Sequence, residues 1–259
     1  MTSTSHTMLI KQNLKQLRLP TIAAEFEKLA READQENQSC PQYLLKLTEL
    51  EVATRSTNAL QSRIHQAKFP LIKELDTFDF SAIPSLNKRR VLQLTQEDWI
   101  QANENVCWIG SAGTGKTHLA IATGLAACRL GKRVRFYTAA NLVNRLEEAQ
   151  KQYQLERLLA KLEKVDLLVI DELGYLSFSR AGAELLFQVI AERYERSSTM
   201  VTTNLPFGEW GQVFQGERMT AALLDRLTHR CHIFEINGTS YRFKESLGRQ
   251  RQQDQSQKN

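Results

Sequence analysis

Eight residues near the middle of the chain have the spacing of a phosphate-binding loop. The sequence Gly110-Ser-Ala-Gly-Thr-Gly-Lys-Thr117 is a complete G-x-x-x-x-G-K-[ST] pattern, between the apolar run 106–109 and the segment 118–122. Glycines let backbone N–H groups approach phosphate oxygens closely. In this pattern Lys116 places its ammonium against the outer phosphates, and Thr117 offers its hydroxyl to Mg²⁺. The pattern therefore predicts a site for a nucleoside triphosphate and Mg²⁺.

An ordinary glycine turn is the alternative interpretation of this loop. It is disfavoured because the glycines, the lysine and the threonine are all in register between a predicted strand and a predicted helix, whose N-terminus also favours an anion. The residues expected to bind the nucleotide here are Gly110, Ser111, Ala112, Gly113, Thr114, Gly115, Lys116, Thr117 and His118.

Two acidic residues, Asp171 and Glu172, follow a nearly uninterrupted apolar run at 165–170. Such a run is typical of a central parallel strand that is covered on both faces. At its end, Asp171 is expected to hold Mg²⁺ through the water shell of the ion, together with Thr117. Glu172 is expected to polarise the attacking water. Capping of the next helix is the alternative, and the complete phosphate-binding loop favours the catalytic interpretation.

Two more polar residues are candidates for the same site. Asn204 ends a predicted strand over 199–204, where its amide would orient the water or contact the terminal phosphate; termination of the strand before Pro206 is the alternative. Arg226 lies on a predicted helix between residues 214 and 231. A guanidinium presented by a neighbouring subunit would stabilise charge in the transition state, whereas a surface role is the alternative.

The elements that must position these residues alternate between strands and helices. Strands are predicted at 106–109, 134–138, 165–170, 199–204 and 231–236, and helices near 87–99, 116–128, 139–164 (two helices), 181–196 and 214–231. This order predicts an α/β P-loop NTPase core with about five parallel strands. Basic and apolar residues alternate over 134–138, which predicts a strand at an edge of the sheet.

Helical periodicity dominates residues 1–67, with interruptions at Pro20 and near Ser39. We expect a small all-helical N-terminal domain that binds DNA or a partner, with a packing appendage as the alternative. Prolines break the helical pattern over 68–85, which predicts a linker. The remaining divisions are an ATPase domain over 86–247 and a disordered tail over 248–259.

The charge balance suits a polyanionic partner. Lys plus Arg number 34 against 29 acidic residues, a formal net charge of +5. The basic residues considered for DNA binding are Lys132, Arg133, Arg135, Arg145, Lys151, Arg157 and Lys161, and salt-bridged helix faces or a solvated sheet edge are the alternatives. The 4 cysteines lack metal-ligand spacing. No apolar run approaches a membrane span and no signal-peptide pattern opens the chain, so we expect a cytoplasmic protein without membrane contact.

Together these motifs resemble the AAA+ proteins of the helicase-loader and IstB-like group, and most closely the IstB-like helper ATPases of bacterial insertion sequences. The stretches that carry the resemblance are 105–120, 168–175, 202–206 and 222–229. The likeness implies the first sensor position for Asn204, an arginine finger for Arg226, and a DNA-facing insertion at 139–164. Only a short stretch follows Ile236, which implies a reduced or absent AAA+ lid and leaves Arg242 as the nearby candidate for a second sensor.

The resemblance also implies a function. Proteins of this kind bind ATP, assemble head to tail on double-stranded DNA as rings or spirals, deform the DNA, and recruit or stimulate the transposase of the same element. A replicative helicase loader is the alternative within the group. A small-molecule kinase and a non-hydrolysing nucleotide switch are alternatives from other classes, and Glu172 disfavours the switch because a scaffold needs no carboxylate to activate water.

Overall fold

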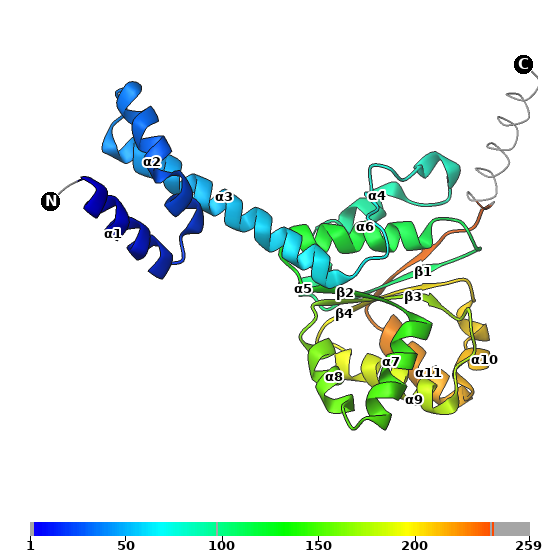
Figure 1. The fold of residues 1–259 in the computed structure, drawn as a ribbon. Helices are drawn as coiled ribbons and strands as arrows, with labels where there is room; N and C mark the ends of the chain where they lie inside the picture. Colours follow the sequence, from blue (N-terminus) through cyan, green and yellow to red (C-terminus); the bar gives the residue numbers. More distant parts are fainter. Residues whose placement is uncertain (1–2, 97, 239, 241–259) are drawn as a thin grey trace, which may run out of the picture. The chain divides into compact units, whose positions relative to one another are not determined.

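The computed structural model describes residues 3–96, 98–238 and 240 of the chain (Figure 1). The chain divides into two compact units, Met1–Ser62 and Arg63–Asn259.

The N-terminal unit is helical, as predicted. Its helices are α1 (Ser3–Gln16), α2 (Pro20–Gln35) and the first part of α3 (Cys40–Ala67). Ile22, Phe26 and Leu47 form its small apolar core. Pro20 starts α2, and the Glu51 carboxylate of α3 accepts the N–H groups of Thr21 and Ile22, so a side chain from another helix caps α2.

A five-stranded parallel sheet in the order β2-β3-β4-β1-β5 forms the centre of the larger unit. Its strands are β1 (Asn105–Ile109), β2 (Val134–Thr138), β3 (Leu167–Leu173), β4 (Ser198–Thr203) and β5 (Cys231–Glu235). The prediction of about five parallel strands is confirmed, as is the edge position of β2. The alternation over 134–138 also implies one solvent-exposed face, and this is wrong: Tyr137 and Phe136 point to opposite faces and are both buried, so the strand is covered on both faces.

Helices cover both faces of the sheet (Figure 1). One face carries α4 (Lys88–Gln93) and α6 (Lys116–Arg129); the other carries α7 (Ala139–Lys151), α8 (Leu155–Glu163), α9 (Arg180–Arg193), α10 (Gly211–Phe214) and α11 (Glu217–Thr228). The short elements are α5 (Asp98–Gln101) and two 3-10 turns, η1 (Phe80–Ala82) and η2 (Phe207–Glu209). The predicted pair of helices at 139–164 is confirmed.

One of the predicted helices was wrong in its continuity. The helix expected near 87–99 is divided into α4 and α5, because the Leu94 carbonyl accepts the indole N–H of Trp99 at 3.0 Å. The helix expected between 214 and 231 is confirmed as α11, and the separate turn α10 precedes it. Gln215 is in the left-handed region at φ +51° and Gly216 is extended, so the backbone cannot continue as one helix.

Residues 68–85 pack against α6. The Phe69 ring contacts Gly124 of α6 and lies 6.1 Å from the ring of Phe136. Glu74 forms an ion pair of 2.6 Å with Arg129, the last residue of the same helix. These contacts make the segment part of the larger unit.

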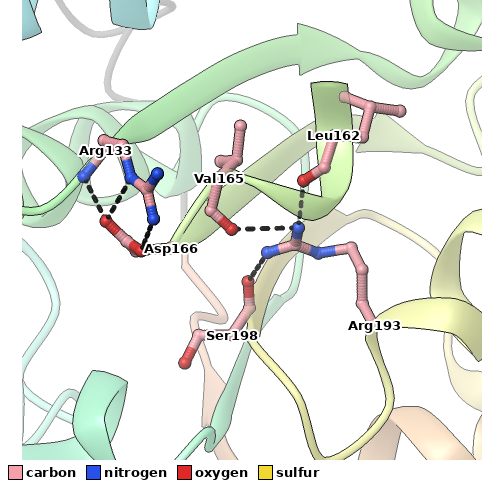
Figure 2. Close-up of polar contacts among 6 residues, drawn as sticks. All are labelled: Arg133, Leu162, Val165, Asp166, Arg193 and Ser198. Atoms are coloured by element: carbon pink, nitrogen blue, oxygen red, sulfur yellow. Dashed lines mark hydrogen bonds and ion pairs between the residues drawn. The ribbon is translucent and has the colours of Figure 1, made fainter. Parts of the chain in front are cut away.

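A buried guanidinium joins α9 to the end of α8, the start of β4 and the connection before β3 (Figure 2). Arg193 is only 3% exposed and donates to the carbonyls of Leu162, Val165 and Ser198 at 2.8, 3.1 and 2.6 Å. Burial lowers the pKa of Arg193 to about 10, so the side chain keeps its charge at neutral pH. The guanidinium therefore satisfies carbonyl groups that precede β3 and begin β4.

A second arginine in the same view has a different environment. Arg133 forms an ion pair of 2.8 Å with Asp166, and its side chain is 62% exposed (Figure 2). The Asp166 carboxylate also accepts the backbone N–H of Arg133 at 2.7 Å.

Arg193→Leu should lower the free energy of unfolding by roughly 2–4 kcal/mol, because it leaves buried carbonyl groups without donors. Arg133→Gln is the matched control and should cost at most about 1 kcal/mol, because exposed ion pairs stabilise little. Denaturant unfolding at neutral pH measures both. Equal losses would contradict the structural role assigned to Arg193.

Candidate functional site

The loop of residues 110–115 connects β1 to α6, and its three glycines all have positive φ angles. Gly115 has φ +95°, and a Cβ there would lie 2.7 Å from the Phe78 ring. Gly110 has φ +148°, and a Cβ there would lie 2.1 Å from the Ile236 carbonyl oxygen. Both positions therefore need glycine for conformational and steric reasons. The loop leads directly into the N-terminus of α6.

The Lys116 ammonium lies within this loop. It donates to the carbonyls of Gly110 and Ser111 at 2.7 and 2.6 Å, and the residue is buried. The Thr114 hydroxyl donates to the Ser111 carbonyl at 2.8 Å, which further fixes the turn. A positive charge is thus held at the centre of a glycine-rich loop, as binding of a polyphosphate requires.

Asp171 and Thr117 are brought together as predicted. The Thr117 hydroxyl donates to Asp171 Oδ1 at 2.9 Å, and the Thr202 hydroxyl donates to the same oxygen at 2.6 Å. Burial raises the pKa of Asp171, whereas the two hydroxyl donors and the charge of Lys116 oppose this rise. A carboxylate and a hydroxyl side by side are the oxygen ligands that Mg²⁺ takes in P-loop proteins, so these residues fit the predicted ion.

Glu172 points away from this buried network. It is exposed, and its φ of +60° is unusual for a residue other than glycine. The pairing of β3 with β4 shifts register between Ile170 and Leu173, so Asp171 and Glu172 lie in a β-bulge. The bulge directs one carboxylate into the core and the next into solvent.

Asn204 lies at the carboxyl ends of the strands, as the phosphate-binding loop does. It is exposed and directly follows Thr203, whose carbonyl accepts the N–H of Gly110 at 3.2 Å. The end of β4 thus meets the beginning of the phosphate-binding loop.

Arg226 has partners on the helical side of the unit. Its guanidinium donates to the Ala222 carbonyl in α11 at 2.8 Å and lies over the Phe187 ring of α9, 5.2 Å from the ring centroid. The residue is half-buried. These contacts join α11 to α9 and do not connect Arg226 with the loop of its own chain.

A segment before β1 also contacts the site, and sequence reasoning assigned it no side chain there. The Glu74 carbonyl lies 2.8 Å from His118 Nε2, and the Phe78 ring packs edge-on against the His118 ring at 5.3 Å. No local pattern marks Phe78, because its contact with Gly115 is tertiary. Thr202 was missed too, because its partners Asp171 and Glu172 belong to another strand.

The basic residues considered for DNA binding fall into two groups. Arg133, Arg135 and Arg145 have intramolecular partners, which are Asp166, the Gln66 carbonyl and the Asn141 side chain, respectively. Lys151, Arg157 and Lys161 are exposed on α7 and α8, and Lys132 is half-buried. Arg242, the second-sensor candidate, lies outside the described residues, as does the tail at 248–259. Within the described part of the chain, no helix is long and apolar enough to cross a membrane.

Comparison with known proteins places these features in a family. Residues 12–248 match the model of the IstB-like ATP binding protein family. An ATP-binding protein of insertion sequence IS5376 from Geobacillus stearothermophilus is 39% identical over 247 residues, covering 95% of this chain and 98% of that protein. The IS21 ATP-binding protein of Pseudomonas aeruginosa is 35% identical over 232 residues, covering 90% and 88%.

Solved structures show the same fold. DnaA from Aquifex aeolicus, determined with bound AMPPCP, matches with a TM-score of 0.55 and 22% identity over 68% of this chain and 54% of that one. DnaI matches with a TM-score of 0.52 and 19% identity, covering 65% of this chain and 89% of that one. These matches confirm the α/β fold that was predicted from the sequence.

Asp171→Asn should raise the melting temperature of the nucleotide-free protein by about 2–4 °C, because it removes a buried charge and keeps the side-chain shape. The pKa of Asp171 in the folded protein is raised above its ordinary value of 3.8. The ionised carboxylate therefore destabilises the fold at pH values above the raised pKa. This difference from wild type should shrink as the pH falls through the raised pKa.

The matched control is Asp166→Asn, measured in the same thermal scans. Although burial raises the pKa of Asp166, the hydrogen bonds and charge of Arg133 bring it below its usual value. Ionised Asp166 therefore stabilises the fold at neutral pH, and this contribution is lost as the pH falls through its lowered pKa. The two variants should change stability in opposite directions, and a lower melting temperature for both would refute the prediction.

Proposed function

Because the chain belongs to the IstB-like family of ATP-binding proteins, we propose that it hydrolyses ATP as the helper protein of an insertion sequence. In this function it assembles on double-stranded DNA, remodels that DNA, and recruits or stimulates the transposase of the same element. The observation that carries the proposal is the junction of the phosphate-binding loop with Asp171, in a chain whose relatives are named for insertion sequences. Those relatives favour it over a replicative helicase loader.

The site residues have distinct roles in hydrolysis. The loop amides and Lys116 would bind the phosphates. Thr117 and Asp171 would hold Mg²⁺, which neutralises phosphate charge when it is bound. Glu172 accepts a proton from the attacking water, consistent with its exposure at the bulge. Asn204 orients that water or the terminal phosphate.

Arg226 acts on the nucleotide of a neighbouring subunit. The resemblance of residues 222–229 to the IstB-like group supports this assignment; in its own chain the guanidinium contacts the Ala222 carbonyl and the Phe187 ring. A residue that completes the site of the next copy requires a head-to-tail interface, which generates rings when it closes and spirals when it does not. Nucleotide bound between subunits then controls assembly.

DNA binding is assigned to the exposed basic residues of the α7 and α8 pair, Lys151, Arg157 and Lys161. Arg133, Arg135 and Arg145 contribute less, because internal partners already occupy their guanidinium groups. The helical N-terminal region over 1–67 serves as the adaptor for DNA or the transposase, joined through 68–85 to the ATPase domain at 86–247.

Glu172→Gln should bind ATP and reduce its hydrolysis at least about 100-fold, because the amide cannot accept the proton of the water. Lys116→Ala should lose nucleotide binding itself. Phosphate release measured with and without duplex DNA, alongside ATP binding, separates the two effects. Glu184→Gln, an exposed change on α9, is the control. Undiminished hydrolysis by Glu172→Gln would reject the assigned role.

The double variant Arg157→Gln, Lys161→Gln should weaken duplex binding and reduce the slope of log affinity against log salt concentration by about 2. Arg180→Gln, an exposed arginine paired with Glu184 on α9, should leave the slope unchanged. Binding titrations over a series of salt concentrations make the comparison. A slope identical to wild type in the double variant would remove α8 from the proposed DNA surface.

A further inference from the structure

The hydroxyl of Thr202 touches both members of the acidic pair. Thr202 lies in β4 and is only 1% exposed. Its Oγ1 donates to Asp171 Oδ1 at 2.6 Å and accepts the backbone N–H of Glu172 at 2.9 Å. One buried side chain thus contacts the side chain of the first carboxylate residue and the backbone of the second.

The direction of these two hydrogen bonds is fixed by chemistry. An ionised carboxylate only accepts hydrogen bonds, so the single hydroxyl proton of Thr202 goes to Asp171. A lone pair of the same oxygen then receives the N–H of Glu172. The contact of 2.6 Å lies within the range of charge-assisted O–H···O⁻ bonds, which are stronger than neutral ones.

The second bond supports an unusual backbone conformation. Glu172 has φ +60° within the bulge, where the regular ladder between β3 and β4 is interrupted. A bulged residue needs another partner for its N–H group. Thr202 provides that partner and so stabilises the turn of the chain that sends Asp171 inward and Glu172 outward.

Two hydroxyls from different elements therefore hold the Asp171 carboxylate. Thr117 donates from α6, the helix that follows the phosphate-binding loop, and Thr202 donates from β4. Thr117 is expected to become a ligand of Mg²⁺. Thr202 lies within the sheet, and its hydroxyl continues to donate to Asp171 when the ion is bound. Rotation of the carboxylate is thus limited by a donor that does not depend on the ion.

We propose that Thr202 is a positioning residue for the Mg²⁺-dependent part of nucleotide binding and for hydrolysis. Its hydroxyl orients the Asp171 carboxylate toward the ion and fixes the Glu172 backbone. The carboxylate that holds Mg²⁺ and the residue that activates the water therefore keep a constant position relative to each other. This inference rests on the proposed function, which supplies the nucleotide and the ion.

A packing role makes a different prediction, and the neighbouring residue provides the comparison. Thr203 is equally buried, and its hydroxyl accepts the N–H of Leu205 at 3.1 Å. Replacing either threonine with valine removes a buried hydroxyl and keeps the side-chain shape. Only the change at Thr202 removes a donor from Asp171.

The test is calorimetric titration of the full chain with AMPPCP, which is not hydrolysed, in Mg²⁺ and in EDTA. Thr202→Val should reduce the gain in affinity that Mg²⁺ provides by about tenfold, as expected for loss of a hydrogen bond to a charged group. Thr202→Ser, which keeps the hydroxyl, and Thr203→Val should stay within about twofold of wild type. In EDTA all four proteins should bind alike, which also shows that the variants are folded.

Three results would overturn the inference: an unchanged Mg²⁺ gain in Thr202→Val, an equal loss of affinity in EDTA, or a loss in Thr202→Ser as large as in Thr202→Val. If Thr202→Val does not fold, Thr202→Cys, whose thiol is a weak donor, replaces it with the same expected direction. Hydrolysis of ATP by the wild type is measured separately. Its absence would refute the proposed function, while the AMPPCP comparison would still decide the role of Thr202.

Discussion

The buried carboxylate of Asp171 imposes the constraint on which the site depends. A charge without contact with solvent must be surrounded by donors, and this one receives hydroxyls from α6 and β4. The requirement fixes the first turn of α6, which follows the phosphate-binding loop, against the ends of β3 and β4. The bulge at Glu172 follows from the same arrangement, because its N–H is satisfied by one of the two hydroxyls.

The two ends of the parallel strands differ in function: the carboxyl ends carry the candidate site, and the amino ends carry a structural cation. At the carboxyl ends of the strands, the phosphate-binding loop, Asp171 and Asn204 come together, as is general for open α/β sheets. Near the opposite ends, Arg193 is a buried cation whose donors are directed at backbone carbonyls (Figure 2). Its role is structural, because those carbonyls belong to the connections before β3 and at the start of β4.

The sequence predicted those features that depend on local pattern. The glycine spacing of 110–117 located the loop, the continuous apolar run before Asp171 identified a central strand, and the alternation over 134–138 identified the edge strand. In contrast, apolar periodicity could not show that the predicted helix is divided before Trp99. The division depends on the hydrogen bond from the Trp99 indole to the Leu94 carbonyl, and that side chain lies beyond the break. Contacts of Phe78 and Thr202 were also beyond reach, since their partners lie 30 or more residues away in the chain.

The proposed function makes the site around Asp171 the switch between dispersed subunits and a DNA-bound assembly. The most direct measurement is the mass of the wild-type complex on duplex DNA, determined by sedimentation without nucleotide and with Mg²⁺ plus AMPPCP. A large complex of defined mass is expected only with nucleotide. A complex of the same mass and abundance under both conditions would contradict control of assembly by the nucleotide.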